Sequence, residues 1–203
     1  VARIRAEYRI TSPFLVLYCG QLIERKGLGD LIPAFAQAVG EGVDMSLLVV
    51  GTGRKELLFK ELAKRKGVAG RVVFAGFVPR EDLPPLYATA HLMALPSRQE
   101  VWGLVVNEAL ACGTPVLSTD NVGAAADLIR DGVNGYVVPS GDSGSLAAAL
   151  KRHFADETDR DAMKARARES IKPFSLATAA DAFEQAVKCA RDHVSRHQYR
   201  GED

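Results

Sequence analysis

Two glutamates, Glu100 and Glu108, are separated by seven residues in an almost wholly apolar stretch of the chain. Between Val101 and Cys112 only Asn107 and Glu108 are strongly polar, so we expect a helix over residues 103–112 to be largely buried. A buried carboxylate is costly unless it is paired or hydrogen-bonded. The helix alone leaves two interpretations open. Glu108 either reaches the surface or a basic partner, or it is held there to bind the hydroxyls of a ligand.

The segment between the two carboxylates is suited to bind an anion. If the helix begins near Gly103, Glu100 lies on the preceding loop and Glu108 lies about a turn into the helix. The backbone N–H groups of Gly103, Leu104 and Val105 are then free to bind an anion, assisted by the helix dipole. A ligand with phosphate in the middle and hydroxyls at both ends matches this layout, as a nucleotide sugar does.

Three earlier loops also contain glycine directly after a strand-like run. In the first, Gly20 lets a ligand approach the backbone and Lys26 places a cation beside a helix N-terminus, which suits a phosphate, although a solvated surface loop is the alternative. The second loop contains Gly51 and Gly53, which allow close backbone approach or simply turn the chain. Neither the dinucleotide-binding glycine pattern nor the P-loop lysine motif occurs, which argues against dehydrogenases and P-loop NTPases.

Short apolar runs alternate with helical patterns from residue 14 to residue 138. Predicted strands cover residues 14–19, 46–50, 72–75, 91–95, 115–118 and 135–138, with helices over 29–39, 54–66, 81–88, 104–112 and 124–130. Only helices are predicted after residue 143, over 146–154, 160–170 and 176–193. Continuous apolar strands that alternate with helices indicate βαβ crossovers in a parallel sheet covered on both faces. We predict an α/β fold with a Rossmann-like, doubly wound sheet of about six parallel strands and a helical C-terminal segment.

The overall composition is that of an ordinary globular chain, with 203 residues, 47% apolar and 25% charged. A formal net charge of +1 gives no reason to expect a nucleic-acid partner. Three widely spaced cysteines favour reduced thiols and a cytoplasmic setting, and no run is long and apolar enough to span a membrane. No acidic pair of the DxD type indicates a metal site, so we expect neither a metal ion nor a cofactor.

Four segments carry a family resemblance: GQLIERKG, VVGTG, FAGFVPREDLPPLYATAHLMALPSRQEVWGLVVNEALACGTPV and NVGAAADLIRDGVNGYVVPSGD. In this order they resemble the donor-binding C-terminal domain of group 1 glycosyltransferases, which belong to glycosyltransferase family 4 and have the two-domain GT-B architecture and retaining chemistry. The resemblance covers roughly residues 14–150. It implies a donor-binding domain over residues 1–150, helices that pack on it over 151–203 with frayed last residues, and an acceptor-binding N-terminal domain that is absent.

The resemblance also implies roles for the two glutamates. Glu100 would contact the transferred sugar or lie close to the reacting centre, and Glu108 would accept hydrogen bonds from the ribose hydroxyls. Backbone groups around Gly103, Leu104 and Val105 would hold the phosphates or the sugar. The substrate would be a nucleoside-diphosphate sugar of the UDP or GDP type, and the transfer would need no metal ion.

In the earlier loops the resemblance implies that Lys26 neutralises the diphosphate and that Phe77 and Val78 contribute to the base pocket. The family commonly has Arg directly after the first glycine, where this chain has Gln21, so the cationic grip on the diphosphate would rest on Lys26.

The leading hypothesis is therefore the donor half of a retaining glycosyltransferase, inactive without its N-terminal domain, through which it could associate peripherally with a membrane. Gln21 keeps open a rival, a nucleotide-sugar-binding module without transfer activity. A nucleotide-sugar epimerase or hydrolase of GT-B architecture is a third hypothesis.

Overall fold

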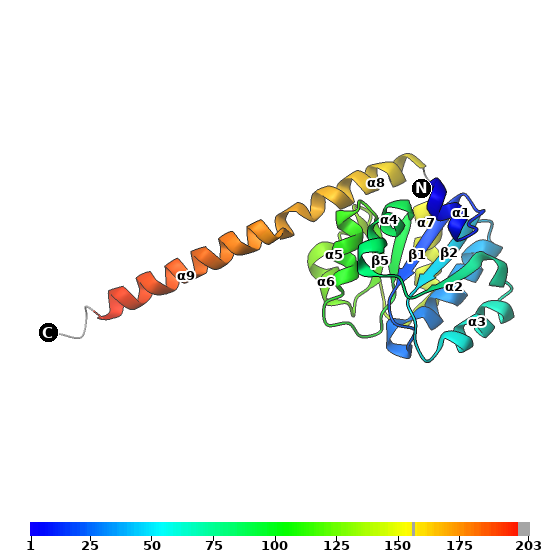
Figure 1. Cartoon of the computed structure of the whole chain (residues 1–203), viewed down its shortest axis with the longest axis horizontal. Coiled ribbons are helices and arrows are strands. Elements are labelled where there is room, and N and C mark those ends of the chain that lie inside the picture. The colour runs from blue at the N-terminus through cyan, green and yellow to red at the C-terminus, as the bar shows by residue number, and fades with distance from the viewer. Residues whose placement is uncertain (156, 199–203) are drawn as a thin grey trace. The chain divides into compact units, whose positions relative to one another are not determined.

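The computed structural model describes residues 1–155 and 157–198 of the chain and divides it into two compact units. The first unit is Val1–Ser170 and the second begins at Ile171. The first contains the sheet and the helices around it (Figure 1). Within the described residues, no helix is both long enough and apolar enough to cross a membrane.

Six parallel strands form one sheet in the first unit, in the order β3-β2-β1-β4-β5-β6. Their bounds are β1 (Phe14–Cys19), β2 (Met45–Val50), β3 (Val72–Gly76), β4 (Leu92–Leu95), β5 (Val116–Thr119) and β6 (Gly135–Val138). The order reverses between β1 and β4, which makes the sheet doubly wound and confirms the predicted fold class. Nearly every residue of β1 and β2 is buried, which explains why these strands show no polar alternation.

The predicted helices are present with ends shifted by a few residues. They are α2 (Leu28–Gly40), α3 (Glu56–Arg65), α4 (Leu83–Thr89), α5 (Leu104–Ala111), α6 (Gly123–Leu128), α7 (Ser143–Ala155), α8 (Glu157–Ser170) and α9 (Leu176–Gln198). The sequence did not predict α1 (Ala2–Glu7). None of its residues is buried, so it lacks the apolar periodicity from which the other helices were predicted. It also missed the short 3-10 turns, η1 (Glu24–Lys26), η2 (Ala69–Arg71), η3 (Arg80–Asp82) and η4 (Lys172–Phe174).

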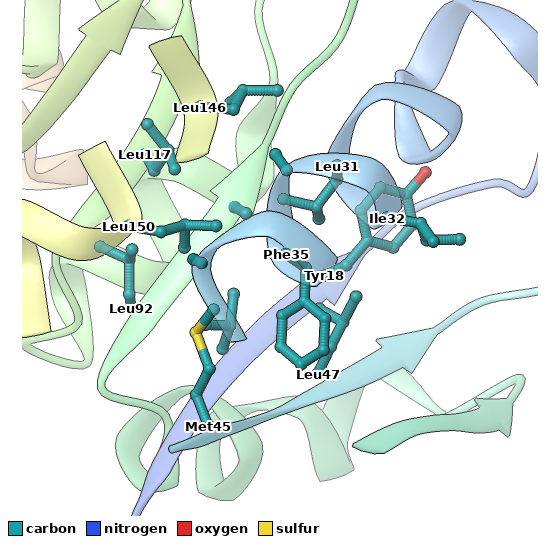
Figure 2. Close-up of a cluster of buried hydrophobic side chains, with 14 of the residues drawn as sticks. Tyr18, Leu31, Ile32, Phe35, Met45, Leu47, Leu92, Leu117, Leu146 and Leu150 are labelled. Atoms are coloured by element: carbon teal, nitrogen blue, oxygen red, sulfur yellow. The ribbon is translucent and has the colours of Figure 1, made fainter. Parts of the chain in front are cut away.

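A hydrophobic core cluster includes the residues where α2 and α7 pack on the sheet and on each other (Figure 2). Leu31, Ile32 and Phe35 from α2 and Leu146 and Leu150 from α7 belong to it. All five are fully buried. Burying one such side chain stabilises the fold by roughly 1.5–3 kcal/mol, so this cluster is what holds α2, and the loop before it, against the end of β1.

α8 belongs to the first unit, where it contacts α5 and α7 and buries Met163 and Ala167. The compact units therefore divide after Ser170, 20 residues beyond the end of the predicted donor-binding domain. The functional division at residue 150 stays a prediction. The fraying predicted for the last residues falls partly on 199–203, outside the described residues.

His91, which is partly buried, and His153, which is buried, connect β1, the start of β4 and α7. The backbone N–H of Leu15 donates to Nδ1 of His91 at 3.1 Å, and Nε2 of His153 lies 3.0 Å from the carbonyl oxygen of His91. Nδ1 of His153 is buried without a hydrogen-bond partner. Burial, with Lys164 and Arg160 nearby, lowers the pKa of each histidine to about 4, so both are neutral at pH 7.

This burial predicts a loss of stability in mild acid. Below pH 6.5 the unfolded chain protonates His153 while the folded chain keeps it neutral down to about pH 4, so the unfolded state binds more protons as the pH falls. Each such histidine lowers the free energy of unfolding by up to about 1.4 kcal/mol per pH unit in this window and has no effect above it. Urea unfolding between pH 7.5 and 4 checks this. His153→Gln, which keeps a donor but does not titrate, should give a shallower pH dependence, and identical slopes would contradict the assignment.

Candidate functional site

The loops after β1 and β4 meet at the carboxyl edge of the sheet because these two strands are neighbours. Lys26, at the end of η1, forms an ion pair with Glu100 in the loop between β4 and α5. Both side chains are largely buried, at 15% and 14% exposed. The structure thus brings together two of the predicted site residues, 74 positions apart in the chain.

The backbone of Glu100 is fixed by the segment before α6. Its N–H donates to the carbonyl of Asn121, and its own carbonyl accepts from the N–H of Gly123, both at 3.1 Å. A Cβ on Gly123 would lie 2.1 Å from the carbonyl oxygen of Val101, so only glycine allows this approach. The position of the Glu100 carboxylate is therefore set by three loops.

Arg25 and Arg98 bind the same two loops together, and neither was predicted as a site residue. Arg25 donates from Nη1 to the carbonyl of Gln99 at 3.1 Å and lies 4.0 Å from the Glu100 carboxylate. Arg98 makes a bidentate pair with Asp30 in the first turn of α2, at 2.8 and 2.7 Å. This pair raises the pKa of Arg98, and Asp30 is only 8% exposed. In the sequence, both arginines lie in strand–helix loops, which marks them as candidates, but no local pattern indicates the residues with which they pair.

Gly103 directly precedes α5, the helix that carries Glu108. Its φ of 97° is left-handed, and a Cβ there would lie 3.0 Å from the Leu95 side chain and 3.3 Å from that of Glu100. α5 follows from Leu104, as predicted, so the first N–H groups of this helix have no partner within it. The prediction of a largely buried helix is wrong, because α5 buries Val106, Ala109 and Leu110 but leaves Leu104 64% exposed. The apolar first turn borders the open carboxyl edge of the sheet instead of the core.

Glu108 lies in the middle of α5 with its side chain 27% exposed. The hydroxyl of Tyr87 in α4 donates to its Oε2 at 2.9 Å, and Nη2 of Arg80 lies 3.5 Å from its Oε1. Neither partner was identified from sequence. The pairing that the sequence left open is therefore present, yet the carboxylate still reaches the surface, so the pairing does not exclude a ligand.

Close packing between the first two loops requires glycine at positions 51 and 53. A Cβ on Gly51, whose φ is 124°, would lie 2.0 Å from the carbonyl oxygen of Gly20, and one on Gly53 would lie 2.5 Å from that of Leu22. Gly20 itself has room for a Cβ. Gln21 is exposed, and its carbonyl accepts a hydrogen bond from Tyr18 at 2.9 Å. Loop packing explains Gly51 and Gly53 without any ligand.

Phe77 and Val78 follow β3 and line a cavity of about 510 Å³ together with residues of α1 and α4. Phe77 is 76% exposed, which leaves its ring free to contact a ligand. No cluster of three or more residues able to hold a metal ion occurs among the described residues.

Comparison with known proteins gives the family. Residues 2–170 match the family model of the glycosyl transferases group 1. The chain belongs to this family. This group 1 chain is 34% identical over 172 residues to N-acetyl-alpha-D-glucosaminyl L-malate synthase of Bacillus anthracis, covering 84% of the chain and 44% of the relative. It is 33% identical over 169 residues to a GDP-mannose-dependent phosphatidylinositol monomannoside mannosyltransferase of Mycolicibacterium smegmatis, covering 80% and 44%.

A similar solved structure is that of HepE from Anabaena in complex with UDP. It matches this group 1 chain with a TM-score of 0.82 and 28% identity, covering 93% of this chain and 52% of HepE. HepE has also been solved with UDP-glucose, matching with a TM-score of 0.80. The chain thus spans about half the length of the proteins it matches, in their C-terminal half.

Gly27 gives a direct test of how the loop that carries Lys26 is positioned. Its φ is 73°, and a Cβ there would lie 1.7 Å from the carbonyl oxygen of Pro96. We expect Gly27→Ala to lower the free energy of unfolding by about 3 kcal/mol or more. Gly40→Ala is the control, because nothing lies within 4 Å of its Cβ and it ends α2; it should be neutral or stabilising by up to about 1 kcal/mol. Urea unfolding of both variants decides, and equal effects would contradict this account of the loop.

Proposed function

We propose that this chain is the donor-binding half of a retaining, metal-independent glycosyltransferase that moves a sugar from a nucleoside-diphosphate sugar to an acceptor hydroxyl. The family assignment supports sugar transfer. The length of the matched proteins supports a second half that binds the acceptor, without which the chain is inactive. HepE, which binds UDP and UDP-glucose, supports a donor of the UDP type, whereas the mycobacterial relative is GDP-mannose-dependent. The donor is therefore UDP- or GDP-linked.

The observation that carries the proposal is the placement of Glu100 and Glu108 on either side of the exposed N-terminus of α5. A diphosphate bound at the amides of Leu104 and Val105 has a carboxylate on each side of it. Glu108 then accepts hydrogen bonds from the ribose hydroxyls, and Glu100 contacts the transferred sugar.

The cations around Glu100 suit the leaving group. In glycosyl transfer the anomeric carbon gains positive charge while the departing diphosphate gains negative charge. Lys26 and Arg25 lie where that negative charge develops, and fixed cations at such a place lower the barrier. Arg25 compensates for the neutral Gln21, so the grip on the diphosphate does not rest on Lys26 alone.

A first experiment identifies the donor. UDP-, GDP- and ADP-linked sugars are compared for the rise in unfolding temperature of the chain, since a ligand at about 100 times its Kd stabilises by about 2.7 kcal/mol. A transferase releases nucleoside diphosphate only when acceptor and the second half are present. Binding without any release would favour the module without transfer activity, and conversion without acceptor would favour the epimerase or hydrolase.

The two glutamates are expected to separate binding from transfer. Glu108→Ala should weaken nucleoside diphosphate binding by about tenfold or more, because it removes charged acceptors for the ribose hydroxyls. Glu100→Ala should not weaken that affinity, because it removes a negative charge and leaves Lys26 free for the diphosphate, yet it should abolish transfer by the two-domain protein. Calorimetry with UDP and GDP measures the affinities. Glu61→Ala on α3, where Glu61 pairs with Lys64, is the control. Equal affinities for Glu108→Ala and this control would refute the ribose role.

A further inference from the structure

Tyr87 is a buried residue whose hydroxyl contacts the candidate site from the interior of the protein. Its side chain belongs to α4 and the residue is only 1% exposed, while Glu108 on α5 reaches the surface. The hydroxyl donates to Oε2 of Glu108 at 2.9 Å. A hydrogen bond between a buried phenol and a carboxylate is of the charge-assisted kind, which is stronger than one between neutral groups.

The position of Tyr87 is itself fixed. The Thr114 hydroxyl donates to the Tyr87 carbonyl at 2.6 Å, and this contact is buried. The Cys19 thiol, at the end of β1, is close enough to the same phenol to influence its pKa. Burial, with Cys19 and Glu108 nearby, raises the pKa of Tyr87 well above its ordinary value, so the phenol stays protonated and remains a donor throughout the working pH range.

Tyr87 uses one oxygen of Glu108 and leaves the other facing outward. Oε1 lies 3.5 Å from Nη2 of Arg80, whose side chain is 83% exposed. An unconstrained glutamate at the surface samples several rotamers and loses that freedom when it binds a ligand. With Oε2 tied to a rigid phenol, the carboxylate is already oriented when a ligand arrives.

We propose that Tyr87 is a positioning residue that holds the Glu108 carboxylate ready for the two hydroxyls of the donor's ribose. This inference rests on the proposed role of Glu108. It concerns specificity as well as affinity. A nucleotide that lacks the hydroxyls leaves the oriented carboxylate without the donors for which it is positioned. A site with a fixed carboxylate rejects such analogues more strongly than a site with a mobile carboxylate does.

The test compares UDP with 2′,3′-dideoxy-UDP, or the GDP pair if the chain prefers guanine, by calorimetry on the wild-type chain and on Tyr87→Phe. We expect Tyr87→Phe to reduce the preference for the ribonucleotide by about three- to tenfold, in the range of one hydrogen bond to a charged group. The preference is a ratio of two affinities of the same protein, so a partly unfolded sample does not distort it. Tyr136→Phe, which removes a hydroxyl from another buried tyrosine, on β6, should leave the ratio unchanged.

Glu108→Ala and the double variant complete a mutant cycle. If Tyr87 acts through Glu108, adding Tyr87→Phe to Glu108→Ala changes the ratio no further. An unchanged ratio in Tyr87→Phe, while Glu108→Ala lowers it, would overturn the positioning role and leave the ribose role intact. An unchanged ratio in Glu108→Ala would overturn the ribose role, and with it this inference. A ratio that falls additively in the double variant would also overturn it, because Tyr87 would then act independently.

Discussion

The adjacency of β1 and β4 is the constraint on which the candidate site depends. The chain first builds β1, β2 and β3 outward in one direction and then returns past β1 to place β4 on its other side. The two loops that leave the carboxyl ends of these neighbours must meet there. The Lys26–Glu100 ion pair and the Arg98–Asp30 pair both form across this junction. Because a crevice opens where the strand order reverses, the same topology that brings the charges together also places them at the edge of the sheet where a ligand can bind.

Glycine contributes to this junction mainly by allowing backbones to approach. Gly27, Gly51 and Gly53 each lie against a carbonyl of a neighbouring loop, closer than any Cβ could. These contacts fix loops that carry the charged side chains, so they serve the site indirectly. Gly103 differs, because its left-handed backbone starts α5 beside the Glu100 side chain and so sets where the helix amides point.

The two carboxylates are held in contrasting ways, which suits their different proposed roles. Glu100 is largely buried and faces cations from the β1–α2 loop, so a ligand that approaches it also meets positive charge. Glu108 is more exposed: the neutral phenol of Tyr87 donates to one of its oxygens, and the largely exposed Arg80 lies 3.5 Å from the other. A carboxylate among cations fits the reacting end of a sugar diphosphate, whereas a carboxylate held by a phenol beside a solvent-exposed arginine stays accessible to hydroxyl donors.

Local patterns predicted the six strands, most of the helices and the start of α5 at Leu104, because apolar periodicity and helix-end signals are properties of short segments. Spacing also placed Glu100 on a loop and Glu108 on a helix. The pairing of Lys26 with Glu100, the pairing of Arg98 with Asp30 and the hydrogen bond from Tyr87 to Glu108 could be seen only in the folded chain. The same holds for the partial burial of α5. These contacts join residues distant in the chain, and strand order, which no local pattern encodes, is what sets them side by side.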